Sequence, residues 1–79
     1  MFTYVITQRG WSEEQMAPYL VLHVWIVMAQ TIQIARNMIE PYLEVFPHPE
    51  DEKIAISCID SGFGWFEKEH IVWSSKPII

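Results

Sequence analysis

Few residues of this chain have the types and spacing that active-site chemistry needs. Cys58 is the single cysteine, and His23, His48 and His70 lie far from it and from one another in the sequence. Zinc sites need three or four such ligands at short local spacing, so we predict no metal site. Cys58 lies in an alternating apolar run, where a small buried thiol is the usual occupant. Gly62-Phe63-Gly64 lacks the rest of a phosphate-binding loop, so we expect no cofactor and a protein that is not an enzyme.

The carboxylates occur in groups at positions where a solvated side chain is the default. These groups are Glu13 with Glu14, Glu50-Asp51-Glu52, and Glu67 with Glu69. Acid–base catalysis would need one carboxyl of a pair to be buried, and none of these positions favours that. Ten acids against five scattered bases give a formal charge of −5. This balance argues against direct binding of nucleic acid and favours a protein partner with a basic surface.

Aromatic residues gather around the predicted turns and in the last quarter of the chain. If residues 65–73 form a strand, Trp65 and Trp73 share one face with Glu67 and Glu69. Tryptophan is enriched at binding hot spots, and an acidic rim suits a basic partner. The predicted partner-binding surface consists of Glu50, Asp51, Glu52, Glu67, Glu69, Trp65 and Trp73. The alternative is that the two tryptophans only cap an open sheet face.

The elements that would position these residues begin with a strand. A chain of 79 residues is expected to form a single domain, residues 1–79, with residues 74–79 as a C-terminal tail. Residues 2–8 are β-branched and aromatic, which predicts a strand that ends in a turn at Arg9-Gly10. Ser12 and Gln15 have the spacing of a capping box, so a helix is expected to begin near Ser12.

Residues 19–40 contain no glycine and no proline, and two interpretations compete for them. Polar residues recur every seven positions from His23 to Glu44, which favours one long helix. The β-branched residues of 19–28 favour a strand that leads into a shorter helix from residue 29. We favour the single helix, because a junction at residues 28–31 would lack the usual turn residues.

The remaining residues predict a hairpin. Residues 53–59 alternate as a strand, residues 60–64 form a glycine-containing turn, and residues 65–73 form the second strand. The expected fold is therefore α+β, a single domain with a three-stranded sheet in the order β-α-β-β and one long helix packed on one face. The strand interpretation of residues 19–28 gives the alternative order ββαββ.

The long helix would carry more apolar surface than one sheet face can cover. A second copy of the chain is the simplest cover, because most small oligomers are two-fold homodimers. The residues expected at this dimer interface are Leu20, His23, Val24 and Val27.

The sequence also indicates a compartment. The uncharged stretch from Tyr19 to Ala29 is shorter than the roughly 20 residues that a membrane-spanning helix needs, and the N-terminus does not have the pattern of a signal peptide. A single cysteine is typical of a reducing environment. We therefore expect a cytoplasmic protein that makes no contact with a membrane.

In size, acidic charge and strand–helix–sheet organisation, the whole chain resembles the small anti-CRISPR proteins that phages direct against type I Cascade-like complexes. That class has no shared motif, so the resemblance assigns no functional residue. It implies a stoichiometric inhibitor that docks on a basic, nucleic-acid-binding surface of a Cas protein in the host cytoplasm. The alternative function is a small homodimeric structural or assembly subunit that docks on a partner through its apolar helix.

Overall fold

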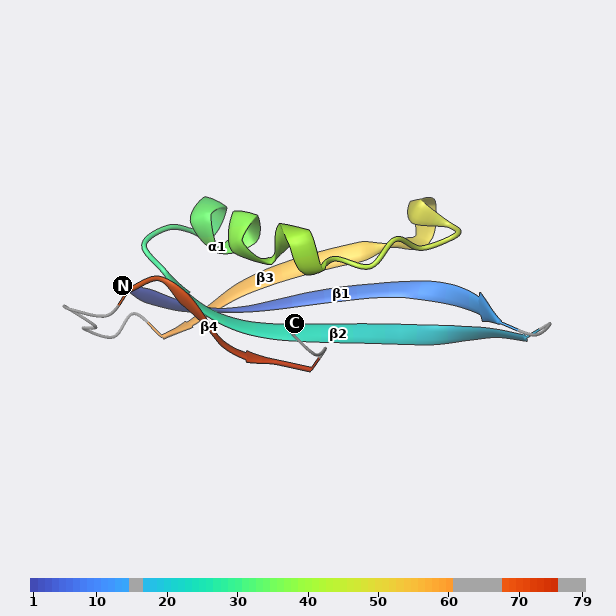
Figure 1. Ribbon diagram of the computed structural model, residues 1–79, viewed down its shortest axis with the longest axis horizontal. Helices are drawn as coiled ribbons and strands as arrows, with labels where there is room; N and C mark the ends of the chain where they lie inside the picture. The colour runs from blue at the N-terminus through green and yellow to red at the C-terminus, as the bar shows by residue number, and fades with distance from the viewer. Residues whose placement is uncertain (15–16, 61–67, 76–79) are drawn as a thin grey trace.

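A four-stranded antiparallel sheet with one helical layer forms the molecule. The computed structural model describes residues 1–14, 17–60 and 68–75. Its elements are β1 (Phe2–Glu14), β2 (Ala17–Ala29), α1 (Ile32–Ile39), the 3-10 helices η1 (Glu40–Tyr42) and η2 (Pro49–Asp51), β3 (Lys53–Asp60) and β4 (His70–Ser74). The strand order is β3-β1-β2-β4. The helix and both 3-10 helices lie on one side of the sheet (Figure 1).

The predicted β-α-β-β fold with a three-stranded sheet and one long helix is wrong. Residues Ala17–Ala29 form a strand that pairs with β1 along its whole length, and α1 has only eight residues. The polar residues that recur every seven positions do not form a solvent-facing helical stripe, because His23 lies in β2 and its side chain contacts Glu44. Thr31 provides the helix start that we expected to be missing: its side-chain oxygen accepts a hydrogen bond from the Ile34 N–H at 3.1 Å. The order of elements is ββαββ.

The turn expected at Arg9-Gly10 and the helix start expected at Ser12 are also wrong. β1 continues through both positions, with Gly10 opposite Val21 in β2. Gly10 is a glycine because the ring of Phe46 packs directly on it: a Cβ at this position would lie 2.6 Å from the Phe46 ring. The residue thus permits a close approach between the sheet and the layer above it.

We expect Gly10→Ala to lower the free energy of unfolding by about 1–3 kcal/mol, because the new methyl group would overlap the Phe46 ring. Urea denaturation measures this loss. In a Phe46→Ala background, which removes the ring, the same substitution should cost much less. An equal cost in both backgrounds would contradict the contact as the cause.

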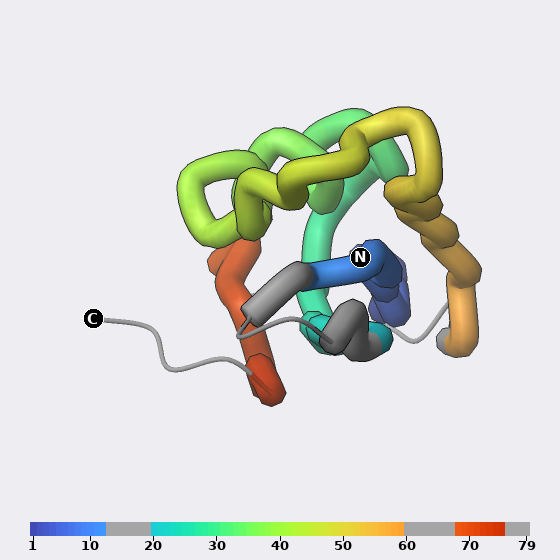
Figure 2. The backbone as a smooth tube through the Cα atoms, turned by 90° about the vertical axis from the view of Figure 1, so that its right-hand side faces the viewer, coloured from blue at the N-terminus to red at the C-terminus, as the bar shows by residue number. Residues whose placement is uncertain are grey.

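The predicted hairpin between the last two strands does not form. β3 pairs with β1 and β4 pairs with β2, so these strands lie at opposite edges of the sheet (Figure 2). The turn expected at residues 60–64 lies outside the described residues except for Asp60, which ends β3. Ser75, in the expected tail, extends the edge pairing: its N–H donates to the Val24 carbonyl at 2.9 Å, and its Oγ accepts from the Val24 N–H at 2.8 Å.

The two faces of the sheet have different surroundings. The face toward α1, which we call the inner face, holds the hydrophobic core, made of Tyr4, Ile6, Trp25, Val27 and Ala29 with Ala35 and Ile39 from the helix. The opposite side, which we call the outer face, carries the alternate residues of the same strands. In the described part of the chain, no helix is long and apolar enough to span a membrane.

Candidate functional site

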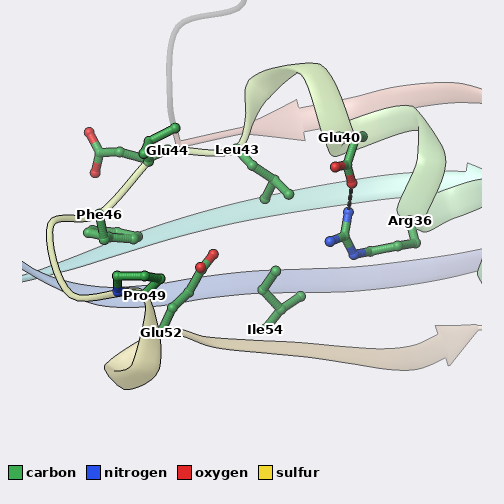
Figure 3. A pocket seen from close by; sticks show the side chains of 9 residues that line it. Arg36, Glu40, Leu43, Glu44, Phe46, Pro49, Glu52 and Ile54 are labelled. Atoms are coloured by element: carbon green, nitrogen blue, oxygen red, sulfur yellow. Dashed lines mark hydrogen bonds and ion pairs between the residues drawn. The ribbon is translucent and has the colours of Figure 1, made fainter.

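A cavity of about 400 Å³ opens between α1, the segment that follows it and the start of β3 (Figure 3). Its lining residues are Arg36, Glu40, Leu43, Glu44, Val45, Phe46, Pro49, Glu52 and Ile54. Three carboxylates against one guanidinium give this lining a formal charge of −2, and the other five residues are apolar. The cavity therefore combines a negative potential with apolar walls, which together suit a cationic group on an apolar stem.

Gln8 holds the segment around Glu44, which forms one wall of the cavity, against the sheet. Its side chain is fully buried on the inner face. Its Oε1 accepts from the Glu44 N–H at 2.9 Å, while its Nε2 donates to the Glu44 carbonyl at 2.8 Å and to Glu52 Oε1 at 2.6 Å. One side chain thus satisfies both backbone polar groups of Glu44 and also contacts a second glutamate. This clamp determines the separation of the two walls that carry Glu44 and Glu52.

Each carboxylate of the cavity has a defined neighbour. Glu40 pairs with Arg36 one helical turn earlier (Figure 3). Glu44 Oε2 lies 3.1 Å from His23 Nε2, and the His23 side chain is only 16% exposed. Glu52 points from the start of β3 toward the opposite wall (Figure 3), and its hydrogen bond within the described residues uses Oε1 alone. The second oxygen of Glu52 can therefore accept a bond from an incoming donor.

The side chains described around the cavity indicate which chemistry it could support. A His–Glu pair such as His23–Glu44 could orient a general base, but the described residues that line the cavity include no hydroxyl, thiol or lysine side chain as a nucleophile. Within the described ranges, no three His, Cys, Asp or Glu side chains form a group that could hold a metal ion. The lining thus offers carboxylate acceptors, and the Gln8 hydrogen bonds hold two of the residues that carry them.

The structure does not bring the predicted partner-binding residues together. Glu50 and Asp51 lie in η2 at one end of the sheet, and only Glu52 of that group lines the cavity. Glu69 directly precedes β4, which begins toward the other end of the sheet (Figure 1). Its Oε2 accepts from the Gln30 N–H at 2.8 Å. Trp73 is half-exposed on the outer face of β4. Trp65 and Glu67 lie outside the described residues.

The four residues expected at a dimer interface are likewise divided between the two faces. Leu20 and Val24 lie on the outer face, where Leu20 is 51% exposed. His23 and Val27 lie on the inner face, where Val27 is fully buried in the core. The alternation of a strand has separated residues that a helix would have placed on one side.

Sequence reasoning did not select the other residues that form the cavity. Arg36 and Glu40 are four residues apart, a spacing that predicts an ion pair on a helix, so this signal was present. Nothing local indicated that Gln8 would be buried or that its partner would be Glu44, 36 residues away.

No protein-family model matches the chain, and neither the curated proteins nor the solved structures include one that is significantly similar to it.

Proposed function

We propose that this protein is a non-enzymatic binding protein that captures a basic side chain of a partner protein in the acid-lined cavity. The observation that carries the proposal is the cavity itself, with its formal charge of −2 and its apolar walls. Lysine and arginine side chains have an apolar stem and a cationic head, which match the walls and the carboxylates respectively. The same negative lining disfavours a phosphate group, so the partner contact is with protein rather than with nucleic acid.

Preorganisation supports this role. Gln8 already holds both walls in place, and Phe46 is packed into the sheet at 4% exposure. A guest side chain would therefore not have to order the loop on binding, which removes part of the entropic cost of association. Its head would bond to the second oxygen of Glu52 in a partly buried site, where a charged hydrogen bond is stronger than in water.

The activity that we propose for this binding is inhibition of the anti-CRISPR type, in the cytoplasm of a phage-infected host. A protein that occupies lysine or arginine side chains on the nucleic-acid-binding surface of a Cas protein would block DNA by local competition. The alternative function was a structural subunit that docks through an apolar helix. The residues expected to form that helix lie in strand β2, so this alternative no longer has its docking element.

The test is DNA binding by a purified type I Cascade-like complex in the presence of the protein. We expect stoichiometric loss of DNA binding with the natural chain. Glu52→Gln should weaken the inhibition about 10- to 100-fold, because it removes the charge that strengthens the bond to the guest. The glutamine keeps an oxygen that can accept from Gln8 Nε2, so the wall should stay in place.

Glu69→Gln is the matched control. It removes the same charge at the opposite end of the sheet, away from the cavity, and should leave the inhibition unchanged. DNA binding that persists at a large molar excess of the natural chain would contradict the anti-CRISPR proposal. Equal losses with the two variants would remove the cavity as the binding site.

A further inference from the structure

The outer face of the sheet is an apolar surface that no described element covers. The helical layer lies entirely on the inner side (Figures 1 and 2). Along β2, Leu20 and Leu22 are 51% and 55% exposed on the outer face, and Val24 and Ile26 continue the same row. A shallow hollow of about 450 Å³ with mainly apolar walls lies beside Leu20 and Leu22. Contiguous apolar surface of this kind on a small protein marks an interaction site.

The exposed area of the chain indicates how much surface a bound partner would cover. The chain exposes 5609 Å², whereas a compact monomer of 9.3 kDa exposes about 5,000 Å². The radius of gyration is 14.0 Å, against about 12 Å for a compact domain of this length. The excess of about 600 Å² is close to the roughly 800 Å² that each partner buries in a standard interface. One protein-sized contact over the outer face would restore an ordinary exposed area.

The charges of the outer face permit a second copy to be that contact. The chain has a formal charge of −5, so two copies repel one another at a distance. Arg9 and Lys53 are the charged side chains described on the outer face, whereas the described side chains of Glu40, Glu44 and Glu52 line the cavity on the inner side. These two bases lie opposite each other toward one end of the face. There their long stems can reach solvent at the rim of an interface.

We propose that the outer face is the interface of a two-fold homodimer in which two sheets pack face to face. Leu20, Leu22, Val24 and Ile26 of each copy form its apolar centre. A two-fold contact uses the same patch twice, so a continuous apolar row with no described acid satisfies both partners. Face-to-face packing of sheets places them about 10 Å apart with their side chains interdigitated. The two acid-lined cavities would then lie on the two surfaces of the dimer that point away from the interface.

Sedimentation equilibrium of the full chain over a dilution series tests the proposal. We expect a species of twice 9.3 kDa at micromolar concentration. Leu22→Glu should raise the dissociation constant at least about a hundredfold, because each dimer carries two copies of the substitution at its centre. Since Leu22 is more than half exposed in the single chain, the variant should still fold. Ala55→Glu, at an exposed position on the same face, is a second variant with the same expected result.

Val45→Glu is the matched control, because Val45 is 94% exposed but lies beside the cavity on the inner side. It should remain a dimer, and so should Glu52→Gln. This separates a failure of the dimer from a failure of the cavity. A natural chain that is monomeric at micromolar concentration would overturn the proposal. In that outcome a different protein, and not a second copy, would cover this face. A dimer that survives both outer-face variants, or that Val45→Glu dissociates, would overturn it as well.

Discussion

Replacement of Trp25 by alanine should lower the free energy of unfolding by about 3–5 kcal/mol. Trp25 is fully buried in the middle of β2, where it faces the helical layer and is the largest side chain of the core. Its removal would leave a cavity that the paired strands on either side cannot close by collapse. A small domain has a total stability of about 5–15 kcal/mol, so this single change would remove a large fraction of it.

Denaturation of Trp11→Ala under the same conditions is the matched comparison. Trp11 lies on the outer face and is 42% exposed. The same change of residue should therefore cost much less than at Trp25. Comparable losses at the two positions would contradict the assignment of one face as core and the other as open surface.

The second large effect is expected at Gln8. In Gln8→Leu, the side chain keeps its approximate volume but can no longer bond to Glu44 or Glu52. The backbone N–H and carbonyl of Glu44 would lose their partners in a partly buried site, at a cost of about 2–4 kcal/mol for the two groups together. The segment that carries Glu44 should also loosen, which would weaken capture of a basic side chain.

Urea denaturation and hydrogen exchange of the Glu44 amide measure these two effects. Gln33→Leu is the control, because Gln33 is exposed on α1 and bonds only to the Asn37 side chain in the described structure. It should change stability by no more than about 0.5 kcal/mol. Unchanged protection of the Glu44 amide in Gln8→Leu would show that the clamp does not hold the wall.

Local sequence pattern was enough to predict the parts of the fold that depend on neighbouring residues. Residues 2–8 and 53–59 were expected as strands from their alternation and β-branched content, and both lie in strands. For residues 19–28, two local signals disagreed. The β-branched content gave the better interpretation, because the polar residue His23 is bonded to Glu44 instead of facing solvent. Pairing along β1 outweighed the local turn signal at Arg9-Gly10.

Tertiary structure alone decided which residues meet. Gln8 reaches Glu44 across 36 positions, His23 reaches Glu44 across 21, and Gln8 reaches Glu52 across 44. Such contacts depend on strand order and on how the helical layer crosses the sheet, neither of which is encoded in a short window of sequence. The acidic composition predicted a basic partner as a property of the whole chain. Only the fold separates the acids lining the inner cavity from the apolar outer face, because strand alternation sends neighbouring side chains to opposite sides.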